Sequence, residues 1–81
     1  MEKNKYNESG KRDGYWEFYY DNGNLLYKGN YVNDKRDGYW EGYHSNGNLY
    51  YKGHYINGKE DGYWEYYYKN GEMIEQEYFI N

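Results

Sequence analysis

The chain has 81 residues, a formal net charge of −4 and no cysteine, so it can form one small domain without disulfides, thiolate chemistry or a zinc ribbon. Sixteen residues are tyrosine, whereas leucine, isoleucine and valine together number seven, so the interior must be built largely from aromatic rings. Lysine and arginine are dispersed rather than clustered, which disfavours nucleic acid and an anionic membrane as partners.

The first 13 residues form a degenerate half-repeat, for which we expect a short, frayed strand near residues 4–8. The segment Met1-Glu2-Lys3-Asn4-Lys5 lacks the apolar region of a signal peptide, and no apolar run approaches the length of a membrane span. We therefore expect a soluble, cytoplasmic protein.

From residue 14 onward one pattern recurs at constant spacing. Asp-Gly-Tyr-Trp-Glu begins at residues 13, 37 and 61, a period of 24, and an Asn-Gly pair follows at residues 22, 46 and 70. A fixed period of this size indicates one supersecondary unit stacked in tandem. The single 1–81 domain then consists of the half-repeat (1–13) and three repeats, at 14–37, 38–61 and 62–81.

Each repeat predicts one β-hairpin. Tyrosine, tryptophan and phenylalanine favour strands, Asn-Gly between two such runs is a strong hairpin signal, and the frequent glycines disfavour helix. The expected strands span residues 15–21, 24–32, 38–45, 48–56, 62–69 and 72–80. The predicted fold class is all-β: a single-layer, twisted antiparallel meander of about three tandem hairpins, with six to seven strands.

A two-residue turn at Asn22-Gly23 predicts the register of the first hairpin, with Tyr20 opposite Leu25 beside the turn. We expect each tryptophan to cover the glycine that it faces, and each glutamate to pair with a lysine for about 0.2–1 kcal/mol. The predicted cross-strand pairs are Trp16–Gly29, Glu17–Lys28, Trp40–Gly53 and Glu41–Lys52. The charged residues at 11–13, 35–37 and 59–61 are expected in solvated turns.

The third repeat departs from this pattern. The same register puts Trp64 opposite Glu77 and Glu65 opposite Gln76, and Glu75 replaces a tyrosine. One interpretation is a capping strand that discourages edge-to-edge pairing. The alternative is a carboxylate cluster that faces a cation or a basic partner and consists of Glu72, Glu75 and Glu77.

The recurring motif Gly-Tyr-Trp-Glu-x-Tyr-x-x-Asn-Gly-x-Leu resembles the MORN repeat, in particular the bacterial variant of small proteins described as antitoxin-like. The resemblance extends from about Tyr6 to Asn81. It implies a twisted single-layer ribbon of successive hairpins. For function it implies a scaffold, a dimerisation module or a protein-binding surface, and some members of the family were proposed to contact phosphoinositides.

No residue pattern indicates catalysis. His44 and His54 are predicted on opposite faces of the sheet, so they cannot form a dyad or a joint metal site, and Ser45 points away from His44. The glycines precede no helix, so they form no phosphate cradle. We predict a protein that is not an enzyme, with no catalytic residue, no metal and no cofactor.

Rows of aromatic residues are the candidate binding surfaces. One face of a single sheet is normally wet, so aromatic cover on both faces indicates an interaction site. The face with the Glu–Lys pairs carries six tyrosines: Tyr15, Tyr19, Tyr39, Tyr43, Tyr63 and Tyr67. The opposite face carries the alternative aromatic row, which is Trp16, Trp40 and Trp64.

These surfaces support three hypotheses. The first is a non-enzymatic protein-interaction module, antitoxin-like if the resemblance extends to function, whose partner is another protein or a second copy in a homodimer formed through the six-tyrosine face. The second is a small-ligand, nucleotide-like binding or sequestering protein, with aromatic pockets made at an oligomer interface. The third is a structural element that assembles through its edges.

Overall fold

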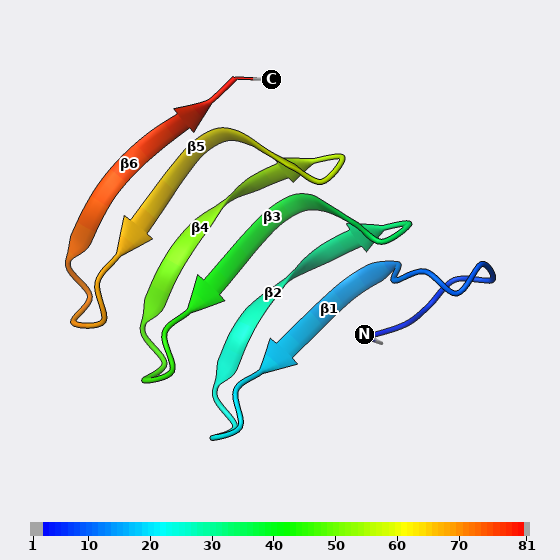
Figure 1. Cartoon of the computed structure of the whole chain (residues 1–81), viewed down its shortest axis with the longest axis horizontal. Helices are drawn as coiled ribbons and strands as arrows, with labels where there is room; N and C mark the ends of the chain where they lie inside the picture. Colours follow the sequence, from blue (N-terminus) through cyan, green and yellow to red (C-terminus); the bar gives the residue numbers. More distant parts are fainter. Residues whose placement is uncertain (1–2, 81) are drawn as a thin grey trace.

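The computed structural model describes residues 3–80, which form a single antiparallel sheet (Figure 1). Its six strands follow one another in chain order: β1 (Gly14–Tyr19), β2 (Leu25–Val32), β3 (Lys35–Tyr43), β4 (Leu49–Ile56), β5 (Lys59–Tyr67) and β6 (Met73–Phe79). The predicted all-β meander is confirmed. The strand expected near residues 4–8 is reduced to one isolated bridge between Tyr6 and Arg12.

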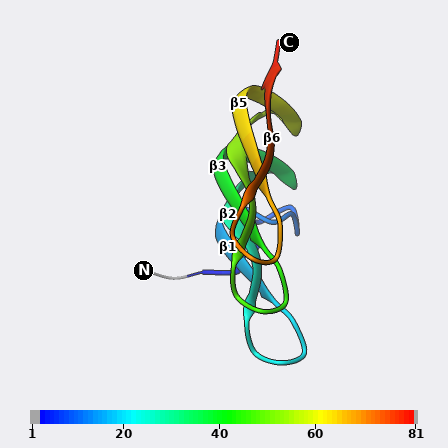
Figure 2. The ribbon, with the colours of Figure 1, turned by 90° about the vertical axis from the view of Figure 1, so that its left-hand side faces the viewer.

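The sheet has no second layer among the described residues, as its edge-on view shows (Figure 2). The molecule measures 41 × 35 × 18 Å along its principal axes. Extensive contacts join only consecutive strands, so each hairpin is stabilised by its immediate neighbours. The described chain contains no helix long and apolar enough to cross a membrane.

The turns between repeats are two-residue turns. Val32 pairs with Lys35, and the intervening Asn33 and Asp34 have φ angles of 49° and 68°, which defines a type I′ turn. The equivalent turn between β4 and β5 is Asn57-Gly58. The strands therefore begin earlier than expected, and the charged residues at 35–37 and 59–61 lie in β3 and β5 rather than in solvated turns.

The turn within each repeat is longer than the sequence predicts. The amide of Gly23 donates to the carbonyl of Tyr20 (3.0 Å), and the amide of Tyr20 donates to the carbonyl of Asn24 (2.8 Å). With Gly23 at a φ of 90°, this is a three-residue loop in which a type I turn is followed by a left-handed glycine. The predicted two-residue turn at Asn22-Gly23 is wrong.

A β-bulge restores the predicted register after this longer loop. Tyr19, not Tyr20 as predicted, pairs with Leu25, and Leu26 is the extra residue before Phe18 pairs with Tyr27. One residue is added in the loop and one in β2, so the two changes cancel. The four predicted cross-strand pairs (Trp16–Gly29, Glu17–Lys28, Trp40–Gly53 and Glu41–Lys52) are confirmed as backbone partners.

A second irregularity lies between repeats and determines where the indoles point. Gly29 pairs with Trp40 but Asn30 pairs with Asp37, so Gly38 and Tyr39 have no partner on β2, and Gly38 has a φ of 80°. Trp40 Nε1 donates to the carbonyl of Asn30 (3.0 Å) at this irregularity. The other two indoles make the same bond at 3.0 and 3.1 Å, from Trp16 to Lys5 and from Trp64 to His54.

The core lies on one face of the sheet, the Trp face, which is the face bearing Trp16, Trp40 and Trp64. Trp40 is fully buried, and its ring lies on Gly29, where an added Cβ would be 2.2 Å from the indole. Trp64 covers Gly53 in the same way. The prediction that Trp40 covers Gly53 and Trp16 covers Gly29 is wrong. Each indole instead points toward the segment that precedes its own strand, where its N–H binds a backbone carbonyl.

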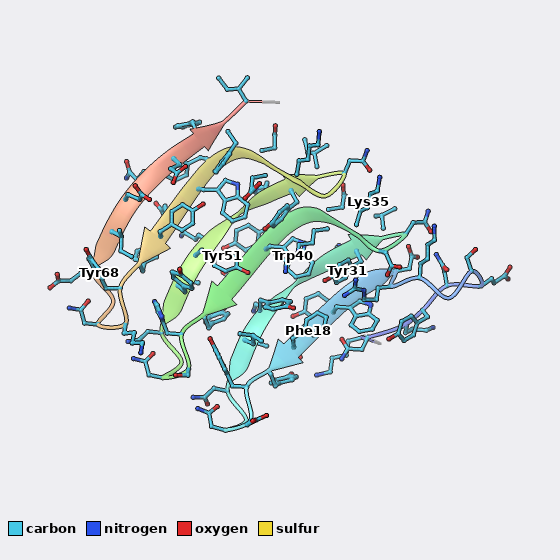
Figure 3. The ribbon with its side chains drawn as sticks, viewed as in Figure 1. Phe18, Tyr31, Lys35, Trp40, Tyr51 and Tyr68 are labelled. Carbon is cyan, nitrogen blue, oxygen red and sulfur yellow. The ribbon has the colours of Figure 1, made fainter. Side chains whose placement is uncertain are left out.

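Arginine and tyrosine side chains complete this core without a second layer. The guanidinium of Arg36 lies 4.5 Å from the ring centre of Trp40 and 4.8 Å from that of Tyr27, and it donates to the hydroxyl of Tyr55 (3.0 Å). Arg12 lies 4.5 Å from the ring centre of Tyr31. Figure 3 labels three aromatic residues from successive strands, Tyr31, Trp40 and Tyr51. The arginines expected in solvated turns therefore cover the aromatic core.

The N-terminal segment closes one edge of the sheet. The side-chain amide of Asn4 donates to the carbonyl of Glu17 (3.2 Å) and accepts from its amide (2.8 Å), as a paired strand would. The Asn4 backbone amide also donates to the carbonyl of Tyr15 (2.9 Å), and Tyr6 packs edge-on against Trp16. At the other end, no segment within residues 3–80 pairs with the outer edge of β6.

Candidate functional site

The face opposite the core, the Tyr face, is built from three Tyr-Glu-Tyr triads. Residues i, i+2 and i+4 of a strand share a face, so each glutamate lies between two tyrosines. Tyr39 and Tyr43 donate to the two carboxylate oxygens of Glu41, at 2.6 and 2.5 Å. The equivalent hydrogen-bonded triads are Tyr15–Glu17–Tyr19 and Tyr63–Glu65–Tyr67. All six tyrosines predicted for the binding surface belong to these triads.

One lysine pairs with each triad, and in the second and third it comes from the preceding repeat. Lys28 Nζ lies 3.5 Å from Glu41, and Lys52 Nζ lies 3.3 Å from Glu65. The predicted ion pairs Glu17–Lys28 and Glu41–Lys52 are wrong, although these residues are cross-strand neighbours. Lys28 has a glutamate on either side in the sheet, and Glu17 is already bound by Lys3 Nζ at 2.6 Å.

Hydrogen bonds within the triads lower the pKa of each triad carboxylate. Hydrogen bonds from Lys3, Tyr19 and Tyr15 lower the pKa of Glu17 to about 2. Partial burial alone would raise the pKa of Glu41, but the hydrogen bonds from its two tyrosines and the charge of Lys28 outweigh it, so that the pKa is lowered. Burial and the Glu17 carboxylate raise the pKa of Tyr15 to about 12. The triad carboxylates are therefore ionised and the Tyr15 hydroxyl keeps its proton at neutral pH.

The triad tyrosines are held in place and still reachable. One tyrosine of each triad is exposed, with 49% of Tyr19, 45% of Tyr39 and 37% of Tyr63 accessible to solvent. The other three are partly buried. A ring already fixed by its hydroxyl loses less freedom on binding than a free side chain does. The hydroxyl hydrogen bonds thus fix the orientation of the tyrosine rings on the Tyr face.

Two equivalent hollows lie on this face between successive tyrosines. The first, of about 360 Å³, is lined by Tyr15 and Tyr39, with Gly29 and Lys28 between them. Its counterpart one repeat later has the same volume and is lined by Tyr39, Lys52, Gly53, His54 and Tyr63. Gly29 and Gly53 contribute backbone to the hollows, because the side of each glycine that would carry a Cβ faces an indole on the Trp face. Both hollows are open, and their volumes lie at the small end of the range for ligand pockets.

The alternative aromatic row is not accessible. Trp16, Trp40 and Trp64 are at most 6% exposed, and each indole N–H is bonded to a backbone carbonyl. These residues hold the repeats together and leave little ring surface for a ligand.

The two histidines lie apart in different surroundings. His54 lines the second hollow beside the ring of Tyr39, whereas His44 Nε2 lies 2.7 Å from the carbonyl of Tyr67 near the hairpin turns. Within residues 3–80, no group of three or more histidine, cysteine, aspartate or glutamate side chains could hold a metal ion. That finding includes the C-terminal carboxylates Glu72, Glu75 and Glu77.

A family model described as the MORN repeat variant matches three successive segments, residues 12–33, 36–57 and 60–81. The chain belongs to the MORN repeat variant family. No match to the chain was found among curated proteins or among solved structures. MORN repeats are generally interaction modules without catalytic activity.

Contacts that the sequence did not predict join one MORN repeat to the next near the hairpin turns. The side-chain amides of Asn22 and Asn24 both donate to the carbonyl of Ser45, at 2.9 Å. One repeat later, Asn46 and Asn48 bind the carbonyl of Lys69 in the same way. The recurring Asn-Gly-Asn spacing was the signal available for these contacts. They help to align the triads of successive repeats across the Tyr face.

Proposed function

We propose that this MORN repeat protein is a non-enzymatic protein-interaction module that binds its partner through the Tyr face. The observation that supports the proposal is the set of three Tyr-Glu-Tyr triads, which place six tyrosines on one face in fixed orientations. Tyrosine is enriched at the centres of protein interfaces because its ring contributes apolar area while its hydroxyl keeps a polar partner.

The charged groups of this face cost less free energy to bury than isolated charges would. Each triad carboxylate accepts two tyrosine hydroxyls and has a lysine within 3.5 Å, so a partner that covers the face leaves none of them without a counter-charge. Burying one ring removes on the order of 100 Å² of apolar area, a gross gain of about 2–3 kcal/mol before association costs. Association costs offset much of this gain, so the affinity depends on how completely a partner covers the rings.

A second copy of the chain is the first partner to test, because two such faces can pack about 10 Å apart and interdigitate their side chains. An antitoxin-like role, in which the face neutralises a different protein, rests on the family resemblance alone. Both are forms of the same proposal, since both use the Tyr face.

A small-ligand function is the second candidate, and the two equivalent hollows favour it. Each lies between two tyrosine side chains and is bordered by a lysine and by a carboxylate, Glu41 in the first hollow and Asp61 in the second. This lining suits the flat ring of a nucleotide-like ligand, with the lysine as the partner for a negatively charged group and the carboxylate opposing it. A hollow of about 360 Å³ on an open sheet needs a second surface to enclose its ligand. This function would therefore also require an assembly.

Sedimentation equilibrium of three proteins tests whether the chain self-associates through the Tyr face. The wild type should self-associate, Tyr39→Ser/Tyr63→Ser should weaken association by at least about tenfold, and Tyr50→Ser/Tyr68→Ser should leave it unchanged. The control removes two tyrosines that are as exposed as the tested pair but lie outside the triads. A monomeric wild type would exclude the homodimer. If the triad variant remains folded and fully associated, the interface does not lie on the Tyr face.

A further inference from the structure

The two edge strands of the sheet, β1 and β6, differ in whether another segment of the chain covers them. Residues 3–13 close the edge of β1, with Asn4 bound to the backbone of Glu17, whereas nothing in the described chain covers the outer edge of β6. Figure 1 shows β6 at the opposite end of the sheet from the N-terminus. A strand edge that presents unpaired N–H and C=O groups can pair with another extended segment.

The side chains of β6 differ between its two faces. On the Trp face, Glu75 and Glu77 lie near Glu60, and within residues 3–80 no cation forms an ion pair with either β6 carboxylate. Partial burial and then the charge of Glu75 raise the pKa of Glu77, so like charges are crowded here. The Tyr face of the same strand carries Tyr78, which is 76% exposed, and Met73, which is 41% exposed.

This edge cannot accept a further repeat of the same kind. Glu77 stands where Gly29 and Gly53 receive the indole of the following repeat, and an added Cβ at those glycines would lie 2.2 and 2.1 Å from the ring. A second β6 is equally unsuitable, because antiparallel pairing centred on Gln76 would place Glu75 against Glu77 of the other copy. Steric fit therefore disfavours a further repeat at this edge, and charge disfavours this pairing of two β6 strands.

We propose that the edge of β6 binds an extended segment of a partner protein by β-augmentation, with lysine or arginine on the Trp face and apolar side chains on the Tyr face. Basic side chains would neutralise Glu75 and Glu77, and apolar ones would cover Met73 and Tyr78. Backbone hydrogen bonds supply affinity and the alternating side chains supply specificity. This site is separate from the Tyr-face proposal and stands without it.

The test uses three synthetic heptapeptides with blocked ends. The first alternates valine with lysine, the second alternates valine with glutamate, and the third contains the residues of the first grouped into a lysine block and a valine block. Binding is measured by fluorescence anisotropy. The peptide site is mapped by chemical shifts and hydrogen exchange of the backbone amides of the full chain. The alternating lysine peptide should bind at least about tenfold more tightly than the other two and should protect amides of β6.

A charge reversal tests whether peptide binding depends on the carboxylates of β6 or only on the net charge of the protein. Glu75→Lys/Glu77→Lys should prefer the glutamate peptide, whereas Glu8→Lys/Asp21→Lys, with the same change in net charge at exposed positions away from β6, should keep the wild-type preference. Equal binding of the alternating and grouped lysine peptides to the wild type would overturn the proposal, and so would binding without protection of β6, or no binding at all. These outcomes need only the wild type, so they hold even if a variant does not fold.

Discussion

Gly29→Ala is the substitution whose effect follows most directly from the packing between repeats. The φ angle of Gly29 is not in the left-handed region, so alanine is compatible with the backbone, yet its Cβ would lie 2.2 Å from the fully buried indole of Trp40. An indole held by its bond to the carbonyl of Asn30 cannot move aside freely. We expect a loss of about 1–3 kcal/mol in the free energy of unfolding, which is the usual cost of overpacking a core. That is a large part of the stability of a domain of this size.

Double-mutant cycles identify which tryptophan is responsible. Gly29→Ala should couple to Trp40→Phe by about 1–2 kcal/mol, because the smaller ring relieves the clash, and should be nearly additive with Trp16→Phe. Urea denaturation followed by far-UV circular dichroism gives the four free energies of each cycle. Coupling to Trp16 but not to Trp40 would refute the packing, because Trp16 is the backbone partner of Gly29 that the sequence favours.

Three further predictions concern charges. In double-mutant cycles, Lys28→Glu should couple to Glu41→Lys by about 0.2–1 kcal/mol and more strongly than Lys52→Glu does; equal couplings would show that Glu41 is shared between the two lysines. Because the pKa of Glu17 is lowered from 4.5 to about 2, its stabilising effect is present above about pH 4.5 and is lost as the pH falls toward 2. Urea titrations between pH 2 and 7 should show this loss, and Glu17→Gln should flatten the pH dependence; an unchanged slope would contradict the triad bonding. Arg36→Lys should lower the free energy of unfolding by about 1–2 kcal/mol, since a lysine cannot both cover two rings and donate to Tyr55, and a change near zero would show that the guanidinium is only a solvated charge.

The sequence predicted the strands and most of the register because the pattern carries independent signals for them. Trp16 opposite Gly29 and Glu17 opposite Lys28 recur one repeat later, and the structure has both pairs. The Asn22-Gly23 pair does not determine the length of the turn, because Asn-Gly suits a type I′ turn as well as a type I turn that ends in a left-handed glycine. The error did not spread along the strand, because the bulge at Leu26 offsets the extra loop residue.

The contact partners were harder to predict than the backbone pairs. Every residue in a central strand has a neighbour on each side, and alternation along one hairpin does not say which neighbour a long side chain reaches. Trp40 and Lys28 both contact the adjoining repeat instead of their partner within the hairpin. The deciding features, the carbonyl at Asn30 and the prior binding of Glu17 by Lys3, appear only once the chain is folded. The Tyr-Glu-Tyr triads can be predicted from the sequence, because their alternation places all three side chains on one face.

The most direct test of the Tyr face as a protein-binding surface is native mass spectrometry of the tagged protein purified from the cells that produce it. Wild type and Tyr50→Ser/Tyr68→Ser should carry the same additional protein mass, either a second copy or one defined partner, and Tyr39→Ser/Tyr63→Ser should lose it while keeping the far-UV spectrum of the folded sheet. A wild type that carries no protein, or a triad variant that keeps its partner, would contradict the proposed function; an added mass of a few hundred daltons would favour the small-ligand alternative.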